Sequence, residues 1–229
     1  MVCQIGESWE KIERLTYLSF ADDTTLFAKS KSALTNMLAD FKRELASVGL
    51  KLNADKCKVQ CSVGSSRATA LKVGADDFPI VASTEGFTLL GTLYTLTGGT
   101  KAEVKHRIKV AWGKFYQIWP LLRHRASSLK QRIRLFNAVV GRSLLWGSES
   151  WTLTVAEKKK LRAVERSMLR RFAGPSRRTG EDWVPWVRRA TRVAEEAAKA
   201  AGVKSWVHQH LLAKWRWAGH VARKDILSP

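Results

Sequence analysis

Two carboxylates stand side by side in the stretch Leu15-Thr16-Tyr17-Leu18-Ser19-Phe20-Ala21-Asp22-Asp23-Thr24-Thr25-Leu26-Phe27-Ala28. Apolar, aromatic and β-branched residues dominate the runs on either side, which favours two β-strands. We expect a buried hairpin in which Asp22 and Asp23 form the two-residue turn. Neighbouring carboxylates repel each other, so the turn needs either solvent or a divalent cation. On hairpin geometry alone, an ordinary solvated Asp-Asp turn is the simpler interpretation.

Length and composition limit the class of protein to which this chain can belong. The chain has 229 residues, of which 45% are hydrophobic, and this suffices for one large or two small folded units. No run of 18 apolar residues occurs, so we expect no membrane span. Residues 1–13 carry charges and no long apolar segment, unlike a secretory signal. The three cysteines, Cys3, Cys57 and Cys61, fit reduced thiols in an intracellular protein.

The charge is distributed unevenly along the chain. Residues 1–100 hold 11 Lys+Arg and 11 Asp+Glu, whereas residues 101–229 hold 29 and 9, which accounts for the net charge of +20. Nine of the ten tryptophans also follow residue 100. The change of composition near Gly98-Gly99 predicts two domains, 1–99 and 100–229. An excess of +20 on the second domain points to a polyanionic partner.

The first domain is expected to be α+β. Apolar residues recur at helical spacing over Ser32–Val48, and Gly49 follows as a stop signal. A helix packed on a small, mainly antiparallel sheet is the arrangement that this order of elements favours. Besides the hairpin, we predict strands over residues 57–63, 69–73 and 87–96.

The second domain is expected to be almost wholly helical. Apolar periodicity predicts one helix that ends at Pro120 and another that ends before Gly141. Thr154-Val155-Ala156-Glu157 has the form of a capping box, which begins a helix that Gly174-Pro175 ends. A fourth helix is predicted over residues 187–201, and Ser205 is a candidate cap for a last one.

Three segments resemble, in order, motifs of the reverse transcriptases of non-LTR (LINE-type) retrotransposons. Phe20-Ala21-Asp22-Asp23 resembles the metal-binding hairpin, and Gly49-Leu50-Lys51-Leu52-Asn53-Ala54-Asp55-Lys56-Cys57-Lys58 resembles the next palm motif. Phe87-Thr88-Leu89-Leu90-Gly91-Thr92 resembles the primer grip. Leu169–Gly174 and Lys214–Arg223 resemble the region after the thumb, so the resemblance covers about residues 1–225. It implies a partial polymerase palm over 1–99 and a basic helical thumb and post-thumb region over 100–229.

The resemblance also implies roles for particular residues. Nucleotide addition uses two divalent ions, and Asp22 and Asp23 would be ligands for Mg²⁺ or Mn²⁺, Asp22 the stronger one. Lys56 would lie near the incoming nucleotide as a candidate proton donor, although a solvated surface lysine is an equal alternative. Leu90 and Gly91 would form the primer grip, where a small residue lets the backbone approach the primer. A glycine at a bulge of an edge strand is compatible with that role.

Part of the family's machinery has no counterpart in these residues. The family needs another metal-binding aspartate on an earlier strand, but Asp22 is the first aspartate of the chain. Glu7, Glu10 and Glu13 lie in a polar stretch without a strand pattern. The fingers subdomain is missing as well. We therefore expect the C-terminal part of a reverse transcriptase that binds metal weakly and does not polymerise alone.

The second domain carries the candidate nucleic-acid-binding residues. Lysine and arginine neutralise phosphates and tryptophans stack on unpaired bases, which favours binding to nucleic acid. The resemblance implies an RNA template and a DNA primer as the partners, with deoxynucleotide triphosphates in the full-length enzyme. The alternatives are a solvated basic face and tryptophans that are mostly core. The basic residues are Lys158, Lys159, Lys160, Arg170, Arg171, Arg177, Arg178, Arg188 and Arg189.

Three functional hypotheses remain open at this point. The first is a fragment of an RNA-directed DNA polymerase, which is a nucleotidyltransferase by ancestry. The second is a non-catalytic nucleic-acid-binding module in which the palm remnant is idle. The third is a degenerate element without function. A genuine start at Met1 would favour the binding module, whereas an upstream reading frame with the missing motifs would favour the polymerase.

Overall fold

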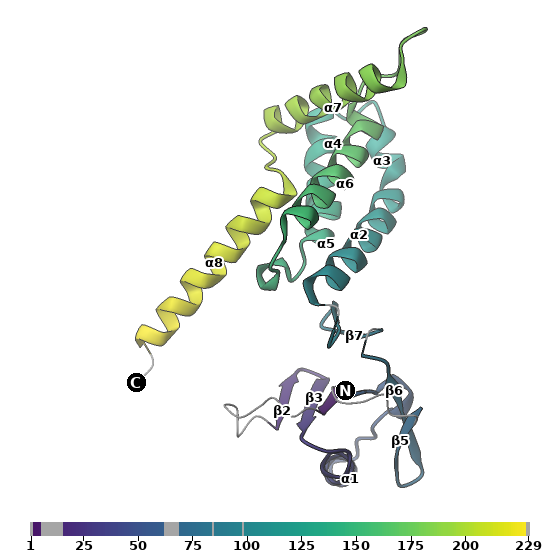
Figure 1. Ribbon diagram of the computed structural model, residues 1–229, viewed down its shortest axis with the longest axis vertical. Coiled ribbons are helices and arrows are strands. Elements are labelled where there is room, and N and C mark those ends of the chain that lie inside the picture. Colours follow the sequence, from purple (N-terminus) through teal and green to yellow (C-terminus); the bar gives the residue numbers. More distant parts are fainter. Residues whose placement is uncertain (1, 6–15, 62–68, 84, 98, 228–229) are drawn as a thin grey trace. The chain divides into compact units, whose positions relative to one another are not determined.

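The computed structural model describes residues 2–5, 16–61, 69–83, 85–97 and 99–227 (Figure 1). The chain divides into two compact units, Met1–Gly99 and Thr100–Pro229. The glutamates considered above, Glu7, Glu10 and Glu13, lie outside the described residues. None of the described helices is both long enough and apolar enough to cross a membrane.

The first unit is an α+β arrangement, as predicted. Its elements are β1 (Val2–Ile5), β2 (Tyr17–Phe20), β3 (Asp23–Ala28), α1 (Lys31–Ser47), a 3-10 turn (Ala54–Lys56), β4 (Lys58–Cys61), β5 (Ala70–Val73), β6 (Asp76–Val81), β7 (Phe87–Leu89) and β8 (Thr92–Tyr94).

Six of these strands form one sheet, in the order β2-β3-β1-β4-β6-β5. The hairpins β2–β3 and β5–β6 are antiparallel, whereas β1 pairs in parallel with β3 and β4, and β4 with β6. Leu34 and Leu38 of α1 are fully buried in one cluster with Leu26, Val59 and Phe78 of the sheet. This cluster is the core that supports the hairpin.

The helix predicted over residues 32–48 is confirmed, with each end one residue earlier than predicted. Ser30 is the N-cap, and its side chain accepts a hydrogen bond of 3.1 Å from the N–H of Ala33. Gly49 follows the helix with φ of 76°, the left-handed conformation that glycine adopts at least cost.

The strand predicted over residues 87–96 is wrong, because β7 and β8 form a separate hairpin there. Leu90 and Gly91 connect them with φ of 48° and 78°, the left-handed pair that a type I′ turn requires. Leucine is an unusual residue at such a position, so the turn was not recognised. The strand β6 was missed as well, because Pro79 within it argues against a strand.

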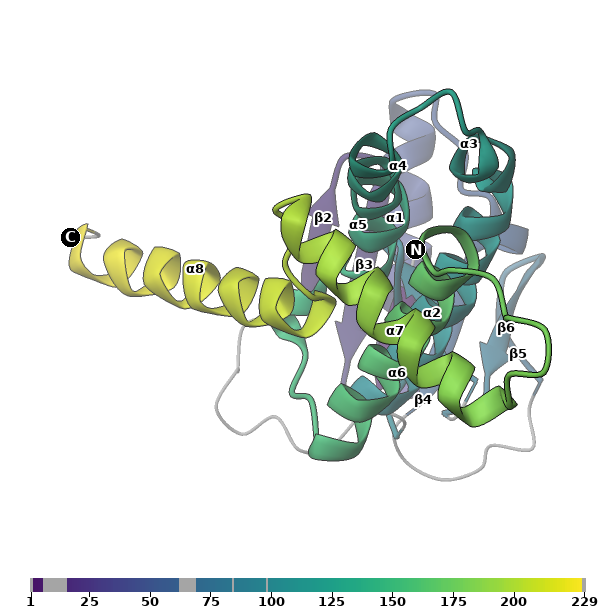
Figure 2. The ribbon, with the colours of Figure 1, turned by 90° about the horizontal axis from the view of Figure 1, so that it is seen from above.

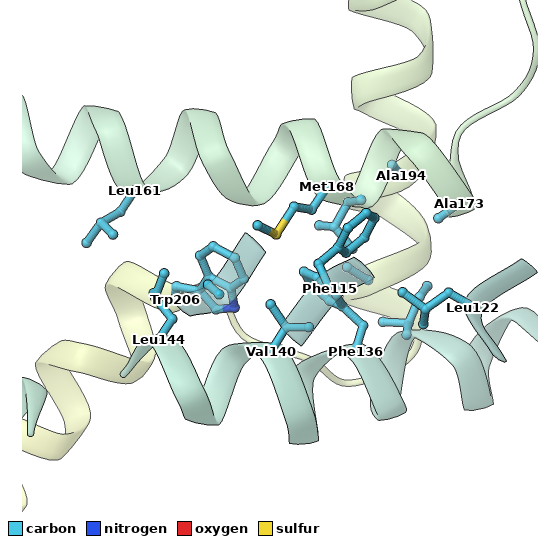
Figure 3. Packing of buried hydrophobic residues seen from close by; sticks show 14 of the residues in the cluster. Phe115, Leu122, Phe136, Val140, Leu144, Leu161, Met168, Ala173, Ala194 and Trp206 are labelled. Atoms are coloured by element: carbon cyan, nitrogen blue, oxygen red, sulfur yellow. The ribbon is translucent and has the colours of Figure 1, made fainter. Parts of the chain in front are cut away.

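The second unit is helical, as predicted (Figure 1). Phe115, Phe136, Leu161, Met168 and Trp206 are fully buried and pack together in its core (Figure 3). Figure 2 shows that the C-terminal part of α8 extends away from the other helices of this unit. The elements are α2 (Gly99–Gln117), α3 (Trp119–Arg123), α4 (Leu129–Phe136), a π-helical turn (Asn137–Gly141), α5 (Arg142–Leu144), a 3-10 turn (Ser148–Ser150), α6 (Val155–Ala173), α7 (Trp183–Ala200) and α8 (Trp206–Leu227).

The start of α6 follows its predicted signal. The N–H of Glu157 donates to the Thr154 hydroxyl at 3.2 Å, and the N–H of Thr154 donates to the Glu157 carboxylate at 2.7 Å. This reciprocal pair is the capping box expected from the sequence. The helix ends at Gly174, also as expected.

Other helix boundaries differ from the predictions. Pro120 lies in the first turn of α3, where proline is tolerated, and the same is true of Pro185 in α7, which begins earlier than predicted. Gly141 lies within a continuous helical path. A Cβ at Gly141 would lie 3.0 Å from the Trp206 indole nitrogen, so this glycine makes room for the core tryptophan rather than ending a helix.

The alternative of mostly core tryptophans holds for only some of the described ones, because Trp112 and Trp119 pack against the core while partly exposed. Trp151 and Trp206 are the only fully buried tryptophans among those that the structure describes. Trp183, Trp215 and Trp217 are exposed by 61%, 74% and 53%. Large apolar rings left in solvent are candidates for contact with a ligand.

Replacing glycine by alanine should change the free energy of unfolding in opposite directions at Gly174 and at Gly113. A Cβ at Gly174 would lie 2.7 Å from the carbonyl oxygen of Arg170 and 3.3 Å from that of Ala190. Gly174→Ala should therefore lower the free energy of unfolding by about 1–3 kcal/mol. Gly113 lies within α2 with nothing within 4 Å of an added Cβ, so Gly113→Ala should raise it by about 0.5–1 kcal/mol. Denaturant unfolding measures both, and equal stability of the two variants would contradict the packing of α6 on α7.

Candidate functional site

The two adjacent aspartates occupy different positions in the β2–β3 hairpin. Phe20 pairs with Asp23, so the two-residue turn consists of Ala21 and Asp22, and Asp23 is the first residue of β3. The predicted Asp22-Asp23 turn is thus wrong by one residue. Ala21 has φ of 52°, a conformation that costs a residue with a Cβ about 1–2 kcal/mol. This strained residue directly precedes the first carboxylate.

Both carboxylates are exposed at one end of the sheet. Hard oxygen ligands of this kind suit Mg²⁺, which keeps several waters and is bound through one or two carboxylates. Within the described part of the chain, no group of three or more His, Cys, Asp or Glu residues could hold a metal ion. Asp22 and Asp23 therefore fit a divalent cation as two ligands of a larger set.

The hairpin is buried in one strand only, because Thr25 and Leu26 of β3 are buried while β2 is exposed. Strand β2 lies at the edge of the sheet, while α1 packs against β1, β3 and β5. Tyr17, Leu18 and Phe20 of β2 are exposed by 61%, 53% and 68%. The apolar residues that predicted a buried strand therefore form an accessible apolar edge.

A cavity of about 310 Å³ adjoins this edge within the first unit. Asp23 and Leu90 both line it, so the fold brings one predicted metal ligand and one predicted primer-grip residue to the same cavity. The sequence analysis missed the apolar walls, because they come from two separate hairpins. These walls include Leu18, Phe20, Phe87 and Tyr94.

Lys56 lies apart from this group. It ends the 3-10 turn Ala54–Lys56, and its backbone N–H donates to the Asn53 side chain at 3.3 Å. Its side chain is exposed and Lys56 does not line the cavity that Asp23 and Leu90 share. Asn53 has a local role here, as the cap of the turn.

Some of the predicted phosphate-binding arginines already have partners. Arg189 donates to both carboxylate oxygens of Glu181, at 2.6 and 2.9 Å. These bonds, with one from the Arg178 backbone N–H, lower the pKa of Glu181 to about 2. Arg177 donates to the Glu181 carbonyl oxygen at 2.6 Å. Arg177 and Arg189 thus hold the segment between α6 and α7 in place.

Arg170 and Arg171 differ from Arg189, because no ion pair with a carboxylate is found for either among the described residues. Arg170 donates to the Thr191 hydroxyl at 3.0 Å, and Arg171 donates to the Tyr116 hydroxyl at 3.1 Å. The Arg171 guanidinium also lies 5.1 Å from the centre of the Trp112 ring. Their neutral partners leave both positive charges available to an anion.

The remaining basic candidates lie on exposed or half-buried helix surface. Lys158 is half-buried in the first turns of α6, and Lys159 and Lys160 are exposed. Arg178 precedes α7 and Arg188 lies within it, and both are exposed. The structure thus spreads the predicted basic residues over α6, α7 and their connection.

The comparisons with known proteins find a reverse transcriptase model and two transposon-related proteins. Residues 1–94 match the family model "Reverse transcriptase (RNA-dependent DNA polymerase)". A transposon-derived protein of Caenorhabditis elegans is 25% identical over 213 residues, which cover 92% of this chain and 72% of that protein. The retrovirus-related Pol polyprotein of a type-2 retrotransposable element of Drosophila melanogaster is 37% identical over 89 residues, 35% of this chain and 8% of the polyprotein. No solved structure matches. The chain is therefore reverse transcriptase-like over residues 1–94.

Proposed function

We propose that residues 1–99 are the later part of the palm of a non-LTR retrotransposon reverse transcriptase. We assign residues 100–229 to its basic thumb and post-thumb region. The observation that carries the proposal is the cavity that Asp23 and Leu90 share. The resemblance assigns metal binding to one of these residues and the primer strand to the other, and a polymerase needs both at one place. The match of residues 1–94 to the reverse transcriptase model supports the same assignment.

The metal-binding part of the proposal rests on Asp22 and Asp23. Their exposed carboxylates would hold Mg²⁺ or Mn²⁺ weakly, because such ions are seldom held by two protein ligands alone. A bound ion would supply positive charge for the triphosphate of an incoming nucleotide. Lys56 is kept as a candidate proton donor on the resemblance alone, since it lies outside the shared cavity.

The nucleic-acid part of the proposal rests on charge. Residues 101–229 hold 29 basic and 9 acidic residues, and such an excess repels itself unless an anion offsets it. Exposed Lys159 and Lys160 and the carboxylate-free pair Arg170 and Arg171 are the groups best placed to meet phosphates. A polynucleotide is the anion that a reverse transcriptase-like chain would bind.

The second candidate, a binding module without catalysis, is favoured for the 229-residue chain by itself. No aspartate precedes Asp22 in these residues. Two carboxylates at one hairpin do not complete a two-metal site. We therefore propose that the chain binds a primer–template but leaves the primer unextended unless a further polypeptide supplies the missing ligands.

One experiment tests both halves of this proposal. The 229-residue chain is mixed with a labelled DNA primer on an RNA template, deoxynucleotide triphosphates and Mg²⁺. The complex should migrate as a shifted band in a native gel, and the primer should keep its length in a denaturing gel. Asp22→Ala, which changes an exposed turn residue, should give the same two results. Template-dependent extension above that variant would show a working polymerase, and the lack of any shifted band would refute the nucleic-acid role.

A further inference from the structure

A second cavity, of about 390 Å³, lies where α6 ends and α7 begins. Its lining comes from both helices and from the connection between them. Gly174 and Pro175 form part of the wall, and a Cβ at Gly174 would lie 3.3 Å from the Ala190 carbonyl oxygen of α7. The chemically distinctive lining residues are Ser167, Arg170, Arg171, Trp183 and Trp186.

The cavity is lined by Arg170 and Arg171, for which the described residues provide no ion pair with a carboxylate. Arg170 is half-buried and bonded to a neutral hydroxyl, and the pKa of its guanidinium is lowered by burial, by Arg166 and by Arg171. Arg166 is paired with Glu195 at 2.6 Å. Glu181, in the segment that leads into α7, is already bound to Arg189. An anion in the cavity would offset the mutual repulsion of Arg170 and Arg171.

The same cavity has aromatic walls. The indole N–H of Trp186 donates to the carbonyl oxygen of Pro175 at 3.1 Å, which satisfies the polar edge of this ring. Trp183 lines the cavity and is 61% exposed. An exposed indole beside two guanidinium groups matches a ligand that joins a phosphate to a flat ring.

We propose that this cavity binds one unpaired nucleotide of a single-stranded nucleic acid, with the base stacked on Trp183 and the phosphate against Arg170 and Arg171. The inference rests on the proposed function and adds to it a defined contact for single strands. A base inside a duplex has no free face for stacking, so the site discriminates between single and double strands.

A strand is a better occupant than a free nucleotide. Sites for small ligands bury most of the ligand, whereas Trp183 and Ser176 leave this cavity open to solvent. Exposed Arg177 and Arg178 follow Ser176 directly in the chain. They can neutralise the phosphates of neighbouring nucleotides, which a mononucleotide lacks.

The test uses the 229-residue chain and labelled oligonucleotides of one length, single-stranded and duplex. Trp183→Leu should lower the affinity for the single strand roughly 5- to 150-fold, the range that stacking of one base supports. The same substitution should leave duplex affinity and the salt dependence unchanged, because it removes no charge. Trp183→Tyr, which keeps an aromatic face, should restore most of the single-strand affinity. Circular dichroism checks that each variant is folded.

The phosphate contact has its own variant and control. Arg170→Gln should reduce the slope of log affinity against log salt by about 0.7 for a single strand. Arg192→Gln is the matched control on α7, because the Arg192 side chain is 74% exposed and does not line the cavity. It removes the same charge and should lower this slope less than Arg170→Gln does.

The outcomes separate this inference from the proposed function. If the wild type and Trp183→Leu bind single strands equally tightly, the cavity site is refuted, but binding by the basic surface is not. A wild-type chain that binds no nucleic acid would refute the proposed function itself. Thymidine monophosphate at micromolar concentration and a polyglutamate peptide should both fail to displace the strand. Displacement by thymidine monophosphate would indicate a site for free nucleotides, and displacement by polyglutamate would indicate a site for acidic peptides. Either result would overturn the proposal.

Discussion

Glu165→Gln should raise the free energy of unfolding by about 3 kcal/mol at pH 8 and change it little at pH 4. Glu165 is 7% exposed on α6, and its carboxylate accepts a hydrogen bond of 3.1 Å from the backbone N–H of Trp206, at the start of α8. Burial raises the pKa of this carboxyl from 4.5 to about 7. Glutamine keeps an acceptor for the Trp206 N–H but carries no charge to desolvate.

The sign of the effect follows from proton binding. Between pH 4.5 and 7 the folded state holds a proton on Glu165 that the unfolded state has released. The contribution of Glu165 is therefore most favourable below pH 4.5 and is lost as the pH rises through 7. Glu195 raises this pKa further, whereas the Trp206 N–H, Arg166 and Arg162 lower it.

Denaturant unfolding across this pH range measures the difference between the wild type and Glu165→Gln. Glu196→Gln is the matched control, because it makes the same substitution on α7, where the Glu196 side chain is 68% exposed. If the difference in unfolding free energy between the wild type and Glu165→Gln stays constant from pH 4 to pH 8, Glu165 is not a buried carboxylate at the start of α8.

Local signals in the sequence were sufficient for several helix ends. The Thr154–Glu157 capping box and the stop signals at Gly49 and Gly174 depend on residues a few positions apart, so they can be recognised without the fold. Turns that use an unusual residue could not be recognised. Ala21 and Leu90 both adopt positive φ, a conformation normally associated with glycine. The turn at Ala21 was therefore misplaced by one residue, and the turn at Leu90 was not predicted.

The candidate sites depend on tertiary packing that periodicity does not encode. Asp23 and Leu90 are far apart in the sequence and meet only because two hairpins lie against one cavity. Arg170 and Arg189 look alike as members of Arg-Arg pairs. The structure distinguishes them, because Arg189 binds Glu181 while Arg170 contacts a neutral hydroxyl beside Trp183.

The affinity of the chain for single-stranded RNA should fall roughly 300- to 15,000-fold between 50 and 200 mM salt if six to ten phosphates are contacted, at about 0.7 log units per log unit of salt for each phosphate. The physical reason is the release of counterions from each phosphate that a lysine or arginine neutralises. Replacing Lys158, Lys159 and Lys160 by alanine should lower the slope of log affinity against log salt by up to about 2, at about 0.7 for each phosphate contact.

A triple variant in the first unit provides the control. Lys29, Lys58 and Lys72 are exposed there and belong to a region whose lysines and arginines are balanced by acidic residues. Their replacement by alanine removes the same formal charge as the triple variant on α6. Because the lysines and arginines that are proposed to neutralise phosphates lie in residues 100–229, this control should keep the slope of the wild type.

The salt dependence of binding by the wild-type chain is the measurement that tests the central claim most directly. Fluorescence anisotropy of a labelled single-stranded RNA, titrated with the 229-residue chain at several salt concentrations, gives the slope. We predict a steep negative slope that the α6 variant reduces and the first-unit variant leaves unchanged. An affinity indifferent to salt, or a slope that the first-unit variant reduces as much, would contradict a nucleic-acid role for the basic helical unit.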